Sequence, residues 1–350
     1  MAPSKTLIFK QIPKGLPVPG QDLVVETREV DLETPPPGGL VLEVLEASYD
    51  PYLRGRMREP TTKSYSPAFA INDPVTNATL SKVLKSDNPN FNVGDFVRAH
   101  TPIAEYVRLD EPAKFFAFKV TNPHSLDLSY FLGPLGMSGL TAWSSLYKIG
   151  QPKKGETIFV SSAAGSVGQI VGQIAKHEGL TVIGSVGSDD KLDFITKELG
   201  FDAGFNYKKE KPAEALPRLA PQGIDIYYEN VGGEHLAAAL DNMNVGGRIP
   251  VCGMISGYNQ RAEERASISN LIQLVAKQIL MQGFLVNAPG FGPDYFREHM
   301  EKLSAWLADG TFKSKLHFTE GIDNAAEGFV DMLEGRNFGK AILRIKSLDQ

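Results

Sequence analysis

The chain has 350 residues, of which 42% are hydrophobic and 22% are charged, and its net charge is −5 at neutral pH. This length predicts two domains or one large one, the composition is that of an ordinary globular protein, and the acidic balance gives no support to binding of nucleic acid or anionic membranes. The sequence has no apolar run of about 18 residues, which predicts no membrane span, and no signal-peptide pattern at the N-terminus. Cys252 is the single cysteine, which excludes an internal disulfide and a multi-cysteine metal site. These features together predict a cytoplasmic protein.

The first part of the chain, up to about residue 131, is predicted to be mostly β. Short strand patterns, among them 41–49 and 92–100, lie between turns that are rich in proline and glycine. The segment 60–74 has no regular period and predicts a long loop, of the kind that often forms a lid beside a binding site.

The pattern changes near residue 132, and from residue 157 onward apolar strands alternate with helices. We expect strands at 157–160, 181–186, 224–231, 247–254 and 281–286, and helices at 166–178, 189–199, 235–243 and 268–280. This alternation predicts an α/β fold with a Rossmann-type doubly wound parallel sheet and helices on both faces. A long amphipathic helix at 298–310 and a strand at 340–345 follow, and the C-terminal segment is expected to return to the first domain.

The strand at 157–160 runs into a glycine-containing loop and then a helix, which is the context of a dinucleotide-binding motif. The usual pattern is G-x-G-x-x-G, and here Ala163 takes the place of the first glycine. Gly165 would let the backbone approach a pyrophosphate, Gly168 would let the helix pack closely on the strand, and backbone N–H groups at the start of the helix would bind phosphate. Ala163 suits this loop if its φ is negative. A tight turn without a ligand is the alternative.

The next strand, 181–186, ends without the acidic residue that binds the ribose 2′-hydroxyl of NAD. Lys191, the nearest cation, and Tyr207, after the following strand, would instead bind the 2′-phosphate of NADP. The alternative is that Ser188 only caps a helix and that Lys191 is solvated. The acidic pair Asp189 and Asp190 favours this alternative, because acidic residues suit the first turn of a helix.

Nine segments spread over nearly the whole chain resemble the zinc-independent medium-chain dehydrogenase/reductases, in particular the prostaglandin reductases and the plant alkenal double-bond reductases. They are 50–57, 135–143, 152–168, 187–191, 205–208, 228–233, 252–259, 283–286 and 335–341, in the order of the family. The resemblance implies a GroES-like, mostly-β catalytic domain built from 1–131 and 312–350, with a Rossmann nucleotide-binding domain at 132–311. It also implies NADPH as the cofactor and a homodimer joined through the nucleotide-binding domains.

The same resemblance assigns roles to individual residues. Lys191 and Tyr207 match the 2′-phosphate ligands, Tyr258 matches the tyrosine near the reacting carbonyl, and Tyr52 matches a tyrosine of the substrate pocket. The other expected cofactor-binding residues are Met137, Thr141, Ala164, Gly165, Ser166, Val167, Gly168, Gly187, Ser188, Asn230, Val231, Cys252, Gly253, Met254, Phe284, Val286, Asn337 and Gly339. This chain departs from the family pattern in two places. The region 60–90 does not match the family's usual pocket loop, and no aromatic residue precedes Glu105. The identity of the substrate is therefore left open.

The larger family includes zinc alcohol dehydrogenases, but the zinc-ligand pattern is missing here. No cysteine stands at 49–51, no Gly-His-Glu occurs, and the six histidines are scattered. We expect His177 and His235 to be surface or packing residues in helices, and Cys252 to be a small buried residue in a strand. No catalytic metal is therefore expected.

Without a metal, the negative charge that develops during the reaction must be stabilised by hydrogen bonds. This suits reduction of a polarised C=C bond, in which hydride goes to the β-carbon of an α,β-unsaturated aldehyde or ketone and an enolate forms. Tyr258 is the candidate donor to the carbonyl oxygen, acting with the nicotinamide ribose hydroxyl, and the α-carbon takes a proton from Tyr258 or water. Tyr52 would line the pocket or give a second hydrogen bond. The alternatives are a surface turn for Tyr258 and a wall without chemistry for Tyr52.

Three other functions remain open at this point. A quinone reductase of the zeta-crystallin type would share the fold and NADPH, although the Tyr258 motif and the stretch 50–52 favour the alkenal reductases. A trans-acting enoyl reductase of a biosynthetic pathway is compatible with the unusual 60–90 region. A non-catalytic NADPH-binding or RNA-binding relative is disfavoured by the complete set of cofactor residues and by the acidic net charge.

Overall fold

The computed structural model describes residues 1–264 and 266–348. They form two compact units, the first made of residues 1–132 together with the segment from Leu316 onward, and the second made of Gly133–Lys315. The chain thus leaves the first unit once and returns to it near the C-terminus.

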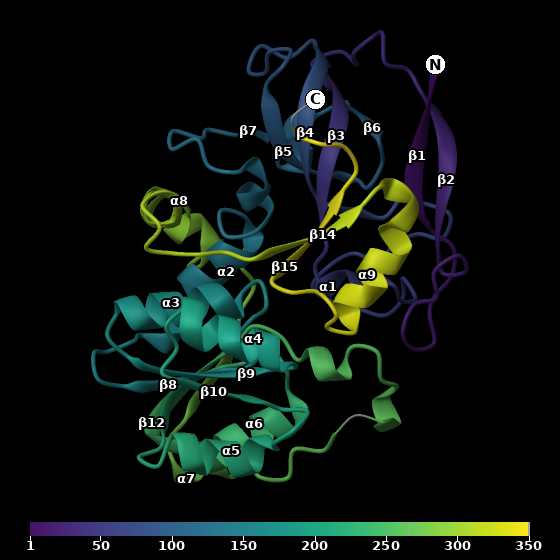
Figure 1. The fold of residues 1–350 in the computed structure, drawn as a ribbon. Coiled ribbons are helices and arrows are strands. Elements are labelled where there is room, and N and C mark those ends of the chain that lie inside the picture. Colours follow the sequence, from purple (N-terminus) through teal and green to yellow (C-terminus); the bar gives the residue numbers. More distant parts are fainter. Residues whose placement is uncertain (265, 349–350) are drawn as a thin grey trace. The chain divides into compact units, whose positions relative to one another are not determined.

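The first unit contains a seven-stranded sheet and a separate strand pair. The sheet has the order β14-β15-β3-β4-β5-β7, with β6 on β3, and β1 pairs with β2 (Figure 1). Their bounds are β1 Ala2–Phe9, β2 Leu23–Val30, β3 Leu40–Ser48, β4 Thr76–Ser86, β5 Phe96–Pro102, β6 Tyr106–Leu109, β7 Phe118–Lys119, β14 Leu316–Glu320 and β15 Lys340–Arg344. β15 runs antiparallel to β3, with Ile342 opposite Ser48, so the C-terminal segment completes the sheet of this unit as expected.

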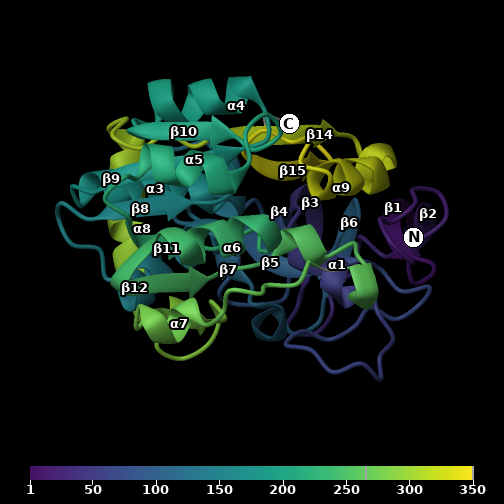
Figure 2. The same cartoon turned by 90° about the horizontal axis from the view of Figure 1, so that it is seen from below.

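A hydrophobic core joins this sheet to the strand pair. The helix α9 (Ala325–Leu333) contacts both β15 and β2 (Figures 1 and 2). It buries Ala325, Phe329 and Leu333, whose spacing of four residues puts them on one helix face. The short helix α1 (Tyr52–Arg56) adds Leu53 to the same core.

The second unit is a six-stranded parallel sheet in the order β10-β9-β8-β11-β12-β13. The strands are β8 Thr157–Val160, β9 Thr181–Val186, β10 Ala203–Asn206, β11 Ile224–Tyr228, β12 Met243–Val251 and β13 Leu280–Gly283. The strand order reverses at β8, and ligands of such sheets bind outside the carboxyl ends of the strands at this switch point. The Rossmann-type sheet and the separate mostly-β unit are both confirmed.

Helices cover both faces of this sheet. α3 (Gly168–His177) and α4 (Asp189–Asp193) lie on one face, and α5 (Pro212–Leu219), α6 (Gly233–Asn242) and α7 (Gln273–Ala276) lie on the other (Figures 1 and 2). This arrangement follows from right-handed crossovers that leave β8 in opposite directions. α2 (Met137–Ser145) packs against both α3 and the long helix α8 (Gly292–Ala308).

Several expectations at the level of single elements were wrong or only partly right. The segment 268–280 holds only the four-residue α7, because Ile272 and Val275 stay 68% and 74% exposed instead of packing on the sheet, and Gln278 has a φ of 53°. The last strand ends at Gly283, before 284–286. The helix expected over 189–199 is α4 followed by one π-helical turn, Phe194–Glu198. Cys252 follows the end of β12 and is only half-buried.

Among the described residues, no helix is both long and apolar enough to cross a membrane.

Candidate active site

The loop after β8 explains why a dinucleotide motif can begin with alanine. The left-handed backbone position is Ser162, with a φ of 51°, and Ala163 is not among the residues with positive φ. A Cβ at Gly168 would lie 2.3 Å from the carbonyl oxygen of Ser162, and a Cβ at Gly165 would lie 2.9 Å from the Ser162 hydroxyl. The two glycines therefore allow α3 and its preceding turn to close tightly on the end of β8.

An unsatisfied hydroxyl in this loop fits an anionic ligand. The Oγ atom of Ser166 is buried and has no hydrogen-bond partner within the described part of the chain. It stands two residues before the start of α3, where backbone N–H groups and the helix dipole favour negative charge. Buried polar groups are normally paired, so this hydroxyl suits a pyrophosphate oxygen as its partner.

A tyrosine hydroxyl lies above the end of β9. A Cβ at Gly187 would be 3.1 Å from the hydroxyl of Tyr207, so the glycine makes room for the phenol. Tyr207 is 42% exposed, and its ring rests edge-on against buried His235, with ring centroids 5.3 Å apart. His235 is thus a packing residue of α6, as expected.

Lys191 lies in α4, the helix after β9, and is partly withdrawn from water. Burial lowers the pKa of Lys191, and the ammonium of Lys208 adds to this effect, whereas the carboxylate of Asp190 opposes it. Ser188 occupies the position before α4, but its side chain makes no capping bond to the helix backbone. The Ser188 hydroxyl instead lowers the pKa of Asp190 by a hydrogen bond.

The other acid of this pair is also engaged. The Asp189 carboxylate accepts a hydrogen bond of 2.9 Å from the side-chain amide of Asn206 and forms an ion pair with Lys209. Asp189 is therefore paired with Lys209, whereas the Asp190 carboxylate keeps its charge beside Lys191. Partial desolvation, a second cation and a tyrosine hydroxyl make this corner suited to a phosphate group.

A buried glutamate organises the loop at the end of β11. One oxygen of Glu229 accepts hydrogen bonds from the Tyr227 hydroxyl at 2.7 Å, from the N–H of Val231 at 2.7 Å and from the N–H of Gly232 at 2.8 Å. Burial raises the pKa of Glu229. The side chain of Asn230 donates to the Ser161 carbonyl at 2.8 Å, which ties this loop to the end of β8. The sequence alone predicts no role for Glu229, although this residue lies inside the matching segment 228–233.

The loop after β12 brings Tyr258 back over its own start. The N–H groups of Cys252 and Gly253 donate to the Glu229 carbonyl at 2.9 and 3.1 Å, and a short turn, Ile255–Gly257, follows. A Cβ at Gly253 would lie 2.9 Å from the Tyr258 hydroxyl. The half-buried Tyr258 ring is therefore folded onto the loop, which differs from the surface turn considered as the alternative.

Other predicted cofactor residues of this unit lie on α2 and in the segments that follow β8, β12 and β13. Met137 begins α2 and Thr141 lies one turn later. Ala164 is buried in the β8 loop, while Met254 follows Gly253 and is more exposed. Phe284 stacks on Phe291 with ring centroids 5.3 Å apart, two residues before Val286.

The first unit holds Tyr52, Asn337 and Gly339. The Tyr52 hydroxyl donates to the side-chain oxygen of Asn77 at 2.8 Å, and it lies 3.3 Å from Nε2 of His100. The Asn337 amide donates to the Gly339 carbonyl at 2.7 Å, just before β15. These three predicted residues belong to a different unit from Lys191 and Tyr258.

The loop expected at 60–74 is present and is held by two arginines. The guanidinium of Arg58 donates to the carbonyls of Gly55, Thr62 and Ser66, and that of Arg56 donates to the Pro67 carbonyl at 3.1 Å. These bonds give the loop a defined conformation without regular structure. The sequence alone predicts no role for either arginine.

This loop also reaches the Tyr52 side chain. Burial and the Asp50 carboxylate raise the pKa of Tyr52, the Arg56 guanidinium, which also holds the loop at Pro67, lowers it, and the phenol of Tyr65 adds a smaller contribution that raises it. Tyr65 is 61% exposed and lies in the middle of the loop. The unusual 60–74 segment therefore supplies part of the surroundings of the predicted pocket tyrosine.

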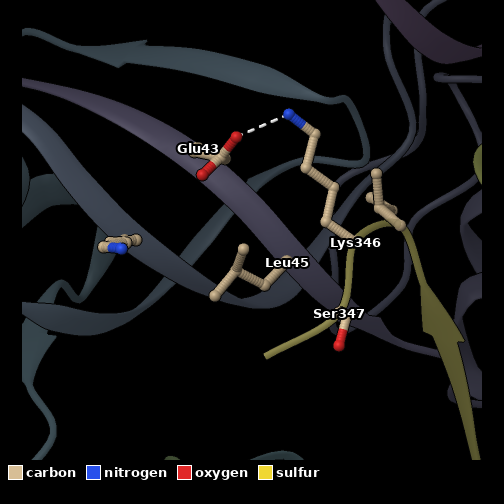
Figure 3. Close-up of a pocket in the computed structure, with 6 residues that line it drawn as sticks. Glu43, Leu45, Lys346 and Ser347 are labelled. Atoms are coloured by element: carbon tan, nitrogen blue, oxygen red, sulfur yellow. Dashed lines mark hydrogen bonds and ion pairs between the residues drawn. The ribbon is translucent and has the colours of Figure 1, made fainter. Parts of the chain in front are cut away.

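A separate hollow of the first unit is lined by Glu43, Leu45, Lys82, Ile345, Lys346 and Ser347 (Figure 3). The ammonium of Lys346 is paired with the Glu43 carboxylate and donates to the Tyr106 hydroxyl at 2.7 Å. This hollow shares no lining residue with the surroundings of Tyr52.

Within residues 1–264 and 266–348, no group of three or more His, Cys, Asp or Glu side chains is arranged as a metal site.

Comparison with known proteins identifies the family. Residues 166–307 match the family model described as zinc-binding dehydrogenase, and residues 5–116 match the N-terminal domain of oxidoreductase. The NADP-dependent oxidoreductase RED1 of Cochliobolus heterostrophus is 51% identical over 350 residues, which are 100% of this chain and 99% of the relative. The chain belongs to the zinc-independent medium-chain dehydrogenase/reductases, in the branch of the alkenal reductases.

Two further relatives support this placement. The 2-alkenal reductase (NADP(+)-dependent) of Nicotiana tabacum is 39% identical over 98% of this chain and 97% of its own length. The solved structure of CurA from Vibrio vulnificus in complex with NADPH has a TM-score of 0.90 and 35% identity, covering 98% of this chain and 99% of that one. Members of this family are oxidoreductases, and these two relatives are named or described with NADP or NADPH.

Proposed function

We propose that the protein reduces the C=C bond of α,β-unsaturated aldehydes and ketones with NADPH. The observation that carries this proposal is the Tyr258 hydroxyl, folded over Gly253 at the carboxyl end of β12, where ligands of this kind of sheet bind. The name of the tobacco relative, a 2-alkenal reductase, points to the same chemistry.

Residues of the second unit bind the cofactor. The loop at Gly165–Gly168, with the unsatisfied Ser166 hydroxyl, binds the pyrophosphate, and Lys191 with Tyr207 binds the 2′-phosphate. When bound, NADPH supplies the hydride. The loop held by Glu229 orients the nicotinamide end, because two of its backbone N–H groups donate to one buried carboxylate oxygen, which also accepts from the Tyr227 hydroxyl.

Tyr258 provides electrostatic stabilisation. Its hydroxyl donates to the carbonyl oxygen of the substrate, which gains negative charge as the β-carbon is reduced. A donor that meets charge only in the transition state raises kcat, not merely affinity. The proton that reaches the α-carbon comes from Tyr258 or from water, and Tyr52 forms part of the substrate surroundings.

The test is turnover with matched substrates. We expect NADPH oxidation with 3-penten-2-one and 2-hexenal, with the saturated carbonyl compound as the product, and little turnover of 2-pentanone. A simple quinone is the comparison that separates the quinone reductase alternative. Turnover of the quinone alone, or an allylic alcohol as the product, would overturn the proposal.

The protein forms a homodimer through the edge of its parallel sheet. β13 pairs with β12 and is the last strand in the sheet order. Exposed apolar side chains gather on β13 and beside α7, namely Leu280 at 48% and the two residues Ile272 and Val275 described above. Unpaired edges and apolar patches of this kind suit strand-to-strand association. Light scattering should give twice the mass of 38.1 kDa, and Leu280→Lys should give the monomer mass.

A further inference from the structure

We propose that Asn77 is a positioning residue that turns the hydroxyl proton of Tyr52 inward, so that Tyr52 serves the reaction as a wall and not as a second donor to the substrate carbonyl. The inference rests on the proposed function for the identity of the substrate. The direction of the Tyr52 hydrogen bond itself follows from the first unit alone.

The chain of bonds begins at a buried ion pair. The ammonium of Lys340 donates to Oδ1 of Asp50 at 2.7 Å and to the Tyr49 carbonyl at 2.6 Å. Burial alone would raise the pKa of Asp50, but the Lys340 ammonium and the hydrogen bonds from Ser48 and Asn77 lower it below its usual value. Asp50 is therefore ionised at neutral pH, and an ionised carboxylate only accepts hydrogen bonds.

Asp50 fixes the orientation of the Asn77 amide. One amide group of Asn77 faces two acceptors, the Ser48 carbonyl at 2.7 Å and Oδ2 of Asp50 at 2.9 Å. Only the NH₂ end of an amide can donate to two acceptors, so the nitrogen must lie on this side. The side-chain oxygen of Asn77 consequently faces Tyr52. This assignment follows from the chemistry of the partners and not from a choice between two similar orientations.

Tyr52 has one proton, and the Asn77 oxygen takes it. The bond from the Tyr52 hydroxyl to Oδ1 of Asn77 is 2.8 Å long, against 3.3 Å to Nε2 of His100. Burial and the charges of Arg56 and Arg98 lower the pKa of His100 to about 4, so the imidazole is neutral at pH 7. With its proton on Nε2, a neutral His100 can donate to the Tyr52 oxygen; with its proton on Nδ1, Nε2 is only the more distant of the two acceptors that face the Tyr52 hydroxyl.

The direction of the Tyr52 hydrogen bond assigns different roles to the two candidate tyrosines. The Tyr52 proton is directed to a residue of β4, at the end of a chain that runs through Asn77 and Asp50 to Lys340. If the Tyr52 hydroxyl donated to the substrate, the buried side-chain oxygen of Asn77 would lose its hydrogen-bond partner, which costs free energy. Of the two tyrosines, Tyr258 is then the donor for the developing enolate.

A double-mutant cycle tests the proposal. The variants are Tyr52→Phe, Asn77→Ser and the pair together, because a serine hydroxyl can still donate to Asp50 but is too short to reach Tyr52. With 3-penten-2-one, we expect Asn77→Ser to lower kcat/KM by roughly five- to tenfold in the wild-type background and by less than about twofold in the Tyr52→Phe background. An equal loss in both backgrounds would make Asn77 a purely structural residue and overturn the proposal.

The single variant Tyr52→Phe tests the missing donor role. We expect kcat to fall by less than about tenfold, because loss of an oxyanion donor costs about 100- to 1000-fold. A fall of 100-fold or more would show that Tyr52 donates to the substrate. Thr79→Val is the matched control on β4, since it breaks a buried hydroxyl pair of 2.8 Å with Thr101 and should show no coupling with Tyr52→Phe.

Urea unfolding of the same proteins tests the bond without any substrate. We expect the coupling between positions 52 and 77 to change the unfolding equilibrium constant by roughly three- to tenfold, the range for one buried hydrogen bond. Coupling in unfolding together with no enone turnover by the wild type would overturn the proposed function but support the Tyr52–Asn77 bond. Absence of coupling in unfolding would overturn the bond itself.

Discussion

The hydroxyl of Tyr258 faces Gly253 so closely that a Cβ at position 253 would lie 2.9 Å from the phenol oxygen. The glycine thus makes room for the hydroxyl at the start of the loop that follows β12. The contact involves the tip of a side chain, so a larger residue at 253 would displace the hydroxyl without disturbing the backbone.

Gly253→Ala should therefore lower kcat with little effect on folding. We expect a loss of up to about 100-fold on 3-penten-2-one, because displacement of a reacting group by about 1 Å can cost this much. Steady-state kinetics and the melting temperature check the prediction. Gly55→Ala is the control, since a Cβ there meets nothing within 4 Å. Full activity of Gly253→Ala would mean that the position of the Tyr258 hydroxyl is not critical.

Lys191→Ala should weaken NADPH binding by roughly 10- to 100-fold and leave the use of NADH nearly unchanged. The reason is the loss of one charge-assisted hydrogen bond to the 2′-phosphate, which NADH lacks. KM for both cofactors is the measurement. Lys197→Ala is the matched control, because this exposed lysine lies one helical turn after α4 and pairs with Asp193. An equal loss with NADH would show that Lys191 does not bind the phosphate.

Arg58→Ala should raise KM for the enone by roughly tenfold and change kcat less. Without its three bonds to backbone carbonyls, the 60–74 loop must be ordered when substrate binds, and that ordering reduces affinity. Lys63→Ala, at an exposed position of the same loop, is the control. If Arg58→Ala leaves KM at the wild-type value, the loop has no part in substrate binding.

His235 should make the stability of the protein depend on pH between about 4 and 6.5. Burial lowers the pKa of His235 to about 4, so the unfolded chain binds a proton that the folded chain refuses in this window. Stability therefore falls as the pH drops, by up to about 3 kcal/mol from this one group. Urea unfolding at several pH values should show a shallower dependence for His235→Leu. An unchanged dependence would mean that the folded protein accepts the proton readily.

Much of the fold could be predicted because local and global signals agree in the second unit. The strand 157–160 and the strand 181–186 were placed with the bounds that the structure shows, since short apolar runs followed by helix patterns have few other interpretations. The prediction of a helix over 268–280 was wrong because apolar residues of this segment are exposed to solvent in the single chain. Apolar periodicity alone does not say what covers a face.

The candidate site could be predicted only where a motif carries it. Tyr258 and Lys191 lie in matching segments, whereas the roles of Glu229 and Asn77 depend on which partners surround a buried polar group. A partner such as Lys340 is far from Asn77 along the chain, and only the pairing of β15 with β3 and of β3 with β4 brings the two together. No local sequence pattern predicts such a contact.

The most direct test of the account is kcat of Tyr258→Phe on 3-penten-2-one, measured beside NADPH binding by fluorescence. The substitution removes one hydroxyl and keeps the ring, so folding and cofactor affinity should be preserved. We predict that kcat and kcat/KM fall together by about 100-fold, the lower end of the range for loss of one oxyanion donor. A variant within about twofold of the wild type in kcat would contradict the account, because another group would then carry the developing charge.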